Sequence, residues 1–143
     1  MIVFLLYWAL AAAATPWAVA VLPSGAEFTL EIASDPAARA RGYMGRQVVG
    51  PRDGMLFVFE RADRHAFWMK DCKVRLDILW LDEAFRVVDI APERPPCPDG
   101  GECPEVVPSG AARYVLEFAG GTSRREGLKT GDRIVILAEP PLP

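Results

Sequence analysis

Histidine and cysteine are scarce in this sequence of 143 residues, which contains one His, at position 65, and three Cys. With no Gly-x-Ser-x-Gly motif and no second histidine, an ordinary Ser-His-Asp triad is excluded. Glycine-rich phosphate-binding loops are absent as well. No cofactor is expected, because no motif that would bind one is present.

Positive charge is also sparse and scattered. The 16 Lys and Arg residues are outnumbered by 19 Asp and Glu, which gives a net charge of -3 and a pI of about 5.2. No run of basic residues is longer than two. Domains that bind nucleic acid, and segments that bind acidic membranes, carry clustered basic residues. We therefore expect neither kind of partner.

The N-terminus has the features of an export signal. Residues 1–14 form an apolar run without a charged side chain, and Pro16 follows. Ala18 and Ala20 are small residues at the two positions that a signal peptidase reads. This pattern predicts removal of residues 1–20, a periplasmic or secreted protein, and no stable membrane span. The alternative is an uncleaved membrane anchor, although the run is short for a span of about 20 residues.

That location bears on the oxidation state of the three cysteines, because disulfides persist in oxidising compartments. Cys97 and Cys103 flank the segment Pro-Asp-Gly-Gly-Glu, whose residue types favour a tight turn, so we predict a disulfide between them. Cys72 then remains as a small, half-buried hydrophobic residue. A zinc site of the three Cys with His65 is the alternative, and it lacks the spacing of paired Cys-x-x-Cys motifs. No metal is expected.

Hydrophobic patterns predict a mainly β domain over residues 21–143. Alternating or continuous apolar runs indicate about seven strands, over residues 27–32, 55–59, 65–72, 76–81, 86–90, 113–118 and 133–138. One short helix is expected from Pro36, capped by Asp35 and ended by Gly42, with a helical turn near 122–127. The close spacing of the strands favours an antiparallel sandwich or a small barrel.

Rare residue types gather in the segment 65–81, which reads HAFWMKDCKVRLDILWL. Strand periodicity places Trp68 and Lys70 on one face. A Trp ring can receive a sugar ring or a cation, and Lys70 can anchor an anionic group. Arg41 and Arg113 are candidates to join the same patch. In the alternative interpretation Trp68 packs beneath a loop and Lys70 pairs with a carboxylate.

Two carboxylates in this segment suggest a different chemistry. Asp71 and Asp77 lie six residues apart, and a hairpin would bring them close enough to act as a glycosidase pair together with Lys70. Apolar residues flank Asp77, so its structural alternative is a partly buried carboxylate satisfied by backbone N–H groups or an arginine.

Several spaced motifs resemble one known family. The segments that carry the resemblance are RGYMGR (41–46), GMLFVF (54–59), FWMK (67–70), LDILWLD (76–82), ARYVLEF (112–118) and GLKTGDRIVI (127–136). In this order they resemble the domain of unknown function 192 family, small bacterial and archaeal proteins often made with export signals. The resemblance implies one compact β-rich domain and no assigned activity. Where that family usually continues with Asn-Thr after FWMK, this chain has Asp71-Cys72.

The sequence therefore predicts an exported, non-catalytic domain that binds a small polar ligand or a partner in the cell envelope. The candidate binding residues are Trp68, Lys70, Asp71, Asp77, Arg41 and Arg113. The alternative is a carboxylate-dependent hydrolase acting on an envelope glycan. A third hypothesis is an accessory protein that docks a partner through an exposed apolar patch.

Overall fold

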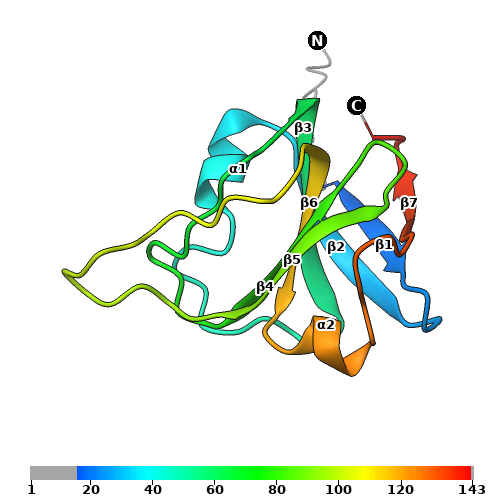
Figure 1. Cartoon of the computed structure of the whole chain (residues 1–143). Coiled ribbons are helices and arrows are strands. Elements are labelled where there is room, and N and C mark those ends of the chain that lie inside the picture. Colours follow the sequence, from blue (N-terminus) through cyan, green and yellow to red (C-terminus); the bar gives the residue numbers. More distant parts are fainter. Residues whose placement is uncertain (1–15, 143) are drawn as a thin grey trace, which may run out of the picture.

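The computed structural model describes residues 16–142, which build one strongly curled sheet with two short helices (Figure 1). The strands are β1 (Trp17–Val21), β2 (Glu27–Ala33), β3 (Asp53–Asp63), β4 (Leu76–Leu81), β5 (Val87–Arg94), β6 (Ala112–Ala119) and β7 (Val135–Glu139). The helices are α1 (Pro36–Arg41) and α2 (Thr122–Arg125). Within these residues no helix is long and apolar enough to cross a bilayer.

The seven strands have the order β5-β4-β6-β3-β2-β1-β7. Every neighbouring pair is antiparallel except β2 and β3, which run parallel. A parallel pair needs a crossover of a dozen or more residues, and residues 34–52, which contain α1, supply it. The Asp35 side chain accepts a hydrogen bond from Ala38 N, so α1 begins at its predicted cap.

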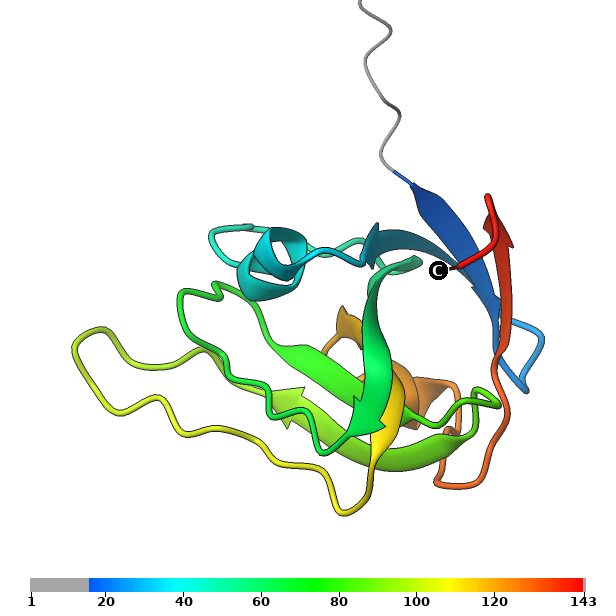
Figure 2. The same cartoon turned by 90° about the horizontal axis from the view of Figure 1, so that it is seen from above.

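The two ends of the sheet approach each other without forming a continuous ladder (Figure 2). An isolated bridge pairs Arg86 with Arg133, and Val87 N donates to Asp132 O at 2.8 Å. The sheet therefore curls almost into a barrel, but it stays open between β5 and β7.

Each face of this sheet has its own core. The inner core fills the curl and contains Ala18, Phe28, Leu30, Leu56, Leu79, Leu116 and Phe118, all at most 1% exposed. The outer core lies on β3, β4 and β6 and contains Phe57, Met69, Ile78, Trp80 and Val115. The segments that follow α1 and β3 cover this outer face, because Tyr43, Met69 and Cys72 pack into it. These covering segments are loops without a strand or an α-helix of their own.

The prediction of a mainly β fold with about seven strands and one short helix is confirmed. The sheet is mixed rather than wholly antiparallel, because the crossover through α1 makes β2 and β3 parallel, and it is not closed into a barrel. Its details also differ at two strands. Residues 65–72 do not form a strand: only Phe67 makes a bridge, to Val106, and residues 70–71 turn. The seventh strand is instead β1, where Ala18 and Ala20 are fully buried. Small side chains suit β1 because it lies between β2 and β7 and faces the inner core.

The position of β1 bears on the predicted signal peptide. Residues 1–15 lie outside the described part of the chain, but Trp17 to Ala20 form most of β1. Cleavage after Ala20 would remove four of the five residues of this strand. A chain that keeps the observed sheet therefore either retains its N-terminal segment or is cleaved before Trp17.

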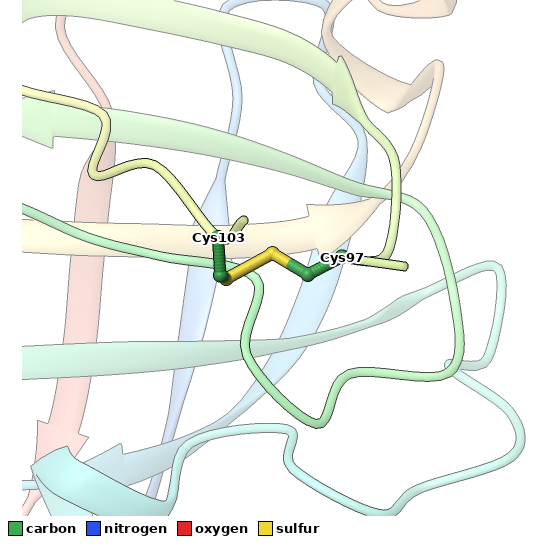
Figure 3. The surroundings of a disulfide bond; sticks show 2 residues. All are labelled: Cys97 and Cys103. Atoms are coloured by element: carbon green, nitrogen blue, oxygen red, sulfur yellow. A yellow bond between two sulfur atoms is a disulfide. The ribbon is translucent and has the colours of Figure 1, made fainter. Parts of the chain in front are cut away.

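The predicted disulfide is present in the loop between β5 and β6 (Figure 3). Cys97 and Cys103 have Cα atoms 5.3 Å apart, and Gly101 N donates to Pro98 O within the turn that they enclose. Cys72 is the free cysteine and is buried. The disulfide thus ties down a Pro-rich loop, residues 95–111, which has no helix or strand apart from the isolated bridge at Val106.

Candidate functional site

A pocket of about 240 Å³ opens on the outer face of the sheet, and we call it the outer-face pocket. It lies where α1 and its exit meet the segment 66–72 above β3 and β6. The residues that line it are Arg39, Ala40, Arg41, Gly42, Tyr43, Met44, Phe57, Phe59, Ala66, Phe67, Trp68, Lys70, Cys72 and Glu117.

Aromatic rings form much of its lining. Phe57 and Phe67 meet edge to face with ring centroids 4.9 Å apart, and Phe59 packs edge to face on Phe67 at 6.3 Å. Tyr43 is only 3% exposed, whereas Trp68 is 43% exposed. Buried rings are held rigidly, and the exposed Trp68 leaves its surface available to a ligand.

Three cationic side chains contribute to the same pocket. The Arg39 guanidinium donates to the backbone oxygens of Val58 and Ser34 and lies 5.2 Å from the Phe59 ring centroid, so it is fixed in place. Lys70 Nζ lies 5.1 Å from the Trp68 ring centroid. Arg41 and Lys70 are both exposed. The outer-face pocket is therefore electropositive where it opens to solvent.

The acidic side chain in this lining is Glu117, from the middle of β6. Its residue is 4% exposed, and its strand neighbours are Met55 on β3 and Ile78 on β4. Burial raises the pKa of Glu117 to about 8, with no other cause acting on it. The side chain is therefore mostly a neutral carboxylic acid at pH 7. A buried carboxyl that faces a pocket and has a strongly raised pKa is a recognised mark of a functional site.

Glu117 affects two neighbours in the pocket. Burial, and then the charge of Glu117, raise the pKa of Tyr43 well above its ordinary value. The same two causes, in the same order, raise the pKa of Cys72 to about 11. Cys72 is therefore a neutral thiol at physiological pH, which is the wrong state for a nucleophile.

Three of the six predicted binding residues meet in this pocket. Trp68, Lys70 and Arg41 all line it, although residues 65–72 are not the predicted strand. Arg113 lies outside the lining: its Nε donates to Phe59 O at 3.3 Å, and its guanidinium lies 5.5 Å from the Tyr114 ring centroid. Asp71 also lies outside it, in a turn with φ of 56°, beside a separate hollow near the disulfide. Trp68, Lys70 and Arg41 thus remain the candidates for ligand contact.

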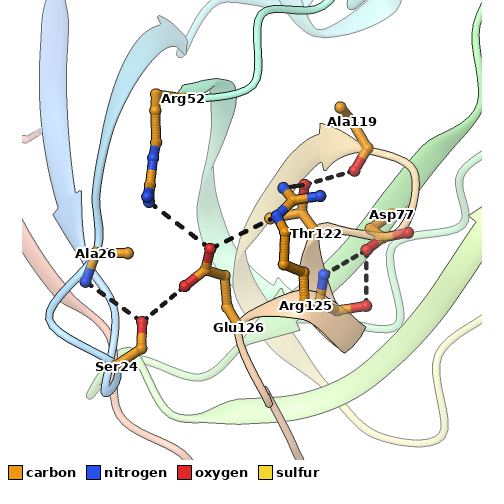
Figure 4. A network of polar contacts seen from close by, with 9 residues as sticks. Ser24, Ala26, Arg52, Asp77, Ala119, Thr122, Arg125 and Glu126 are labelled. Carbon is orange, nitrogen blue, oxygen red and sulfur yellow. Dashed lines mark hydrogen bonds and ion pairs between the residues drawn. The ribbon is translucent and has the colours of Figure 1, made fainter.

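Asp77 has a structural role that the ligand-binding hypothesis did not assign to it. It is fully buried, and its carboxylate accepts hydrogen bonds from Glu93 N at 2.7 Å, Gly121 N at 2.9 Å, and both N and Oγ of Ser123 at 2.6 and 2.7 Å. Figure 4 shows it beside Thr122, at the start of α2. This carboxylate caps a helix and anchors β5, so it cannot face a ligand. The proposed glycosidase pair with Asp71 is therefore wrong.

Sequence reasoning did not select Glu117. The one available signal was a glutamate between Leu116 and Phe118 in an apolar strand. Strand periodicity puts Glu117 on the face opposite to these neighbours. A charged residue at such a position is expected to face solvent. Only the loops that cover the outer face make that position buried.

No group of three or more His, Cys, Asp or Glu residues within residues 16–142 could hold a metal ion. The His65 ring stacks on Phe59 with ring centroids 3.6 Å apart, and its Nε2 lies 3.0 Å from Arg61 O. Its position is thus explained by packing.

The described residues thus form a small, mainly β domain whose curled sheet carries a pocket on its outer face. The chain belongs to the domain of unknown function 192 family, described as "Uncharacterized ACR, COG1430", whose profile matches residues 19–136. This match covers the sheet from β1 into β7 and confirms the resemblance seen in the sequence.

Two solved structures are similar to this chain. One is a protein of unknown function from Novosphingobium aromaticivorans DSM 12444, with a TM-score of 0.74 and 30% identity over 86% of this chain and 94% of that one. The other, from Sinorhizobium meliloti 1021, is described as a "putative transcription regulator", with a TM-score of 0.72 and 30% identity over 84% and 92% of the two chains. No curated protein matches the sequence.

Proposed function

We propose that this protein is a non-catalytic binding protein of the cell envelope, and that its outer-face pocket takes up a small organic ligand with an anionic group. The observation that carries the proposal is the arrangement of the pocket. Buried rings and Trp68 offer an apolar surface, and Lys70 and Arg41 place positive charge where the pocket opens. Ligand pockets commonly combine an apolar lining with a few placed polar groups.

The geometry supports binding better than catalysis. Asp77 is committed to the start of α2, and Cys72 is a neutral thiol. Glu117 therefore lacks a second catalytic carboxylate of the kind that glycosidases use. The hydrolase hypothesis thus has no support from the residues that it named.

The description of the Sinorhizobium meliloti protein suggests a regulatory role, which we do not extend to this chain. Regulators that bind DNA carry a basic surface that neutralises phosphates. This chain has a net charge of -3, and two of its arginines, Arg46 and Arg124, are paired with Glu31 and Glu93. A small ligand is therefore the better supported partner.

Substitution of Trp68 and Lys70 tests the binding proposal. We expect Trp68→Ala and Lys70→Ala each to weaken a ligand by about tenfold, because each removes about 1 to 2 kcal/mol of ring or charge contact. Calorimetry against a panel of aromatic carboxylates, sugar acids, neutral sugars and peptidoglycan fragments would measure this. Lys73→Ala is the matched control, since Lys73 is exposed and outside the outer-face pocket.

Two results would contradict the proposal. One is that no member of the panel binds the wild-type protein at millimolar concentration. The other is that Lys70→Ala and Lys73→Ala weaken a bound ligand equally, because charge near the pocket would then have no specific role.

Export is the second part of the proposal, and intact mass tests it together with the thiol chemistry. We expect the mature N-terminus to lie before Trp17, because β1 belongs to the sheet. Ala12 and Ala14 offer the small residues that a signal peptidase needs for cleavage after Ala14. The same mass should show one bridge and one thiol that is alkylated only after unfolding, since Cys72 is buried. An N-terminus at Val21, or retention of Met1 in the cell, would contradict the expected processing.

A further inference from the structure

We propose that Glu117 determines the specificity of the outer-face pocket: as a neutral carboxylic acid it donates a hydrogen bond to an acceptor oxygen of the bound organic anion, which makes binding proton-linked. This inference rests on the proposed function and adds the ligand class to it. The ligand would carry an apolar body, an anionic group at one end, and a carbonyl or similar acceptor at the other.

The position of Glu117 supports a contact at the inner end of the pocket. Its residue is 96% buried, yet it lines the pocket beside Gly42, at the exit of α1. Gly42, with φ of 44°, ends α1 at this point. A Cβ atom at Gly42 would lie 3.3 Å from Cζ of Phe57 and 3.8 Å from Oε2 of Glu117. The glycine therefore leaves the space beside this carboxyl free of a side chain.

The charges around the pocket select an anion over a cation. Arg39, Arg41 and Lys70 line it, and Glu117 is the acidic residue of the lining. A ligand ammonium would have to pass these cations and would need Glu117 ionised in an apolar site, which costs free energy. An anion is attracted to the open end, and the neutral acid at the inner end offers the O–H donor that a carbonyl needs.

Burial places the pKa of Glu117 at about 8, and the titratable and charged groups around it are the following. Tyr43, after α1, has its pKa raised far above this range, and the pKa of Cys72, from the covering segment, is about 11. The side chains of Met55 and Phe57 on β3 and of Ile78 on β4 do not titrate. Arg39, Arg41 and Lys70 are the cations of the lining, and His65 stacks on the pocket residue Phe59.

Three matched probes test the inference by calorimetry on the mature protein. The first, 4-acetylbenzoate, has the anionic group and a carbonyl acceptor. In the second, 4-isopropylbenzoate, a methyl group replaces the carbonyl oxygen at nearly the same shape. The third, 4-acetylbenzylamine, keeps the carbonyl and exchanges the anion for a cation. We expect 4-acetylbenzoate to bind most tightly at pH 6, with the isopropyl analogue about fivefold weaker and the amine weaker still.

The pH profile provides the second readout. Binding of 4-acetylbenzoate should be constant between pH 6 and 7 and about tenfold weaker at pH 9, because the pKa of Glu117 is about 8 and the ionised form cannot donate. At pH 8 binding should take up about half a proton, seen as a dependence of the heat on the buffer. Glu117→Gln keeps a donor, so it should bind about as well at pH 6 and show no fall at pH 9. His65→Gln is the control and should retain the wild-type profile.

The outcomes separate the two proposals. If 4-isopropylbenzoate binds as tightly as 4-acetylbenzoate, if the amine binds best, or if the wild-type profile is flat, the role of Glu117 is overturned while the pocket remains a binding site. If none of the probes binds at millimolar concentration, and Trp68→Ala also has no effect on any ligand of the panel, both proposals fail.

Discussion

Glu117→Gln is expected to stabilise the folded protein by about 4 kcal/mol at pH 8 and to have little effect near pH 4. In the unfolded chain the carboxyl has its ordinary pKa of 4.5, whereas burial raises the pKa of Glu117 to about 8 in the folded protein. Between these values the unfolded state binds fewer protons than the folded one. The free energy of unfolding therefore falls by about 1.4 kcal/mol for each pH unit.

The sign of this effect follows from the raised pKa. The contribution of the neutral acid is fully present below the ordinary pKa of 4.5, and it is lost as the pH rises through about 8. Glutamine does not titrate and has nearly the same shape, so the variant should lose this pH dependence. Urea unfolding followed by circular dichroism at pH 4, 6 and 8 would measure the three free energies.

Glu60→Gln is the matched control for Glu117→Gln, because Glu60 is exposed near the end of β3. It should change the free energy of unfolding by at most about 0.5 kcal/mol at every pH. A Glu117→Gln variant that is no more stable than wild type at pH 8 would show that the carboxyl is solvated or paired in the folded protein. The stability cost and the proton-linked binding would then both be wrong.

Asp77→Asn is expected to have the opposite effect and to destabilise the protein by about 3 kcal/mol. The Asp77 carboxylate accepts hydrogen bonds from three backbone N–H groups and one hydroxyl. An amide replaces one accepting oxygen with a donor, so at least one buried N–H group would face another donor. Thermal unfolding and urea unfolding at pH 7 would measure the loss.

Asp71→Asn is the control, because it makes the same chemical change at an exposed turn position with φ of 56°, which Asn also tolerates. We expect its effect to stay within about 0.5 kcal/mol of zero. If Asp77→Asn were equally mild, the capping network beneath α2 would contribute little to stability, and Asp77 would again be open to another role.

These two buried carboxyl groups differ in one respect that matters for function. Asp77 is surrounded by donors that the fold supplies, whereas Glu117 has burial as the cause of its raised pKa. Proteins often accept a loss of stability where activity requires it, and this supports the role that we propose for Glu117. The contrast directs attention from Asp77, which the sequence suggested, to Glu117, which it did not.

Local signals in the sequence predicted much of the fold. Alternation identified β2 and β6, a continuous apolar run identified the centre of β3, and the Asp35-Pro36 pair identified the start of α1. Cys97 and Cys103 were paired correctly because the turn between them is itself local. Each of these features is determined by residues close together in the chain.

The features that were predicted wrongly have a common physical cause: each is determined by contacts with distant parts of the chain. The segment Trp17–Val21 is short and contains two alanines. It forms a strand because β2 and β7 pair with it on either side. Residues 65–72 alternate like a strand, but they lie as a covering loop over the outer core. Glu117 is buried by the same cover. Trp68, Lys70 and Arg41 nevertheless line the same pocket, as predicted. In the loop, as in the predicted strand, Trp68 and Lys70 are exposed while Met69 between them is buried.

The pairing of β1 with β7 joins residues 17–21 to residues 135–139. These contacts span nearly the whole sequence, and such non-local pairings slow folding because a long loop must close first. The sheet therefore reaches its full width only when residues 135–139 are available to pair with β1.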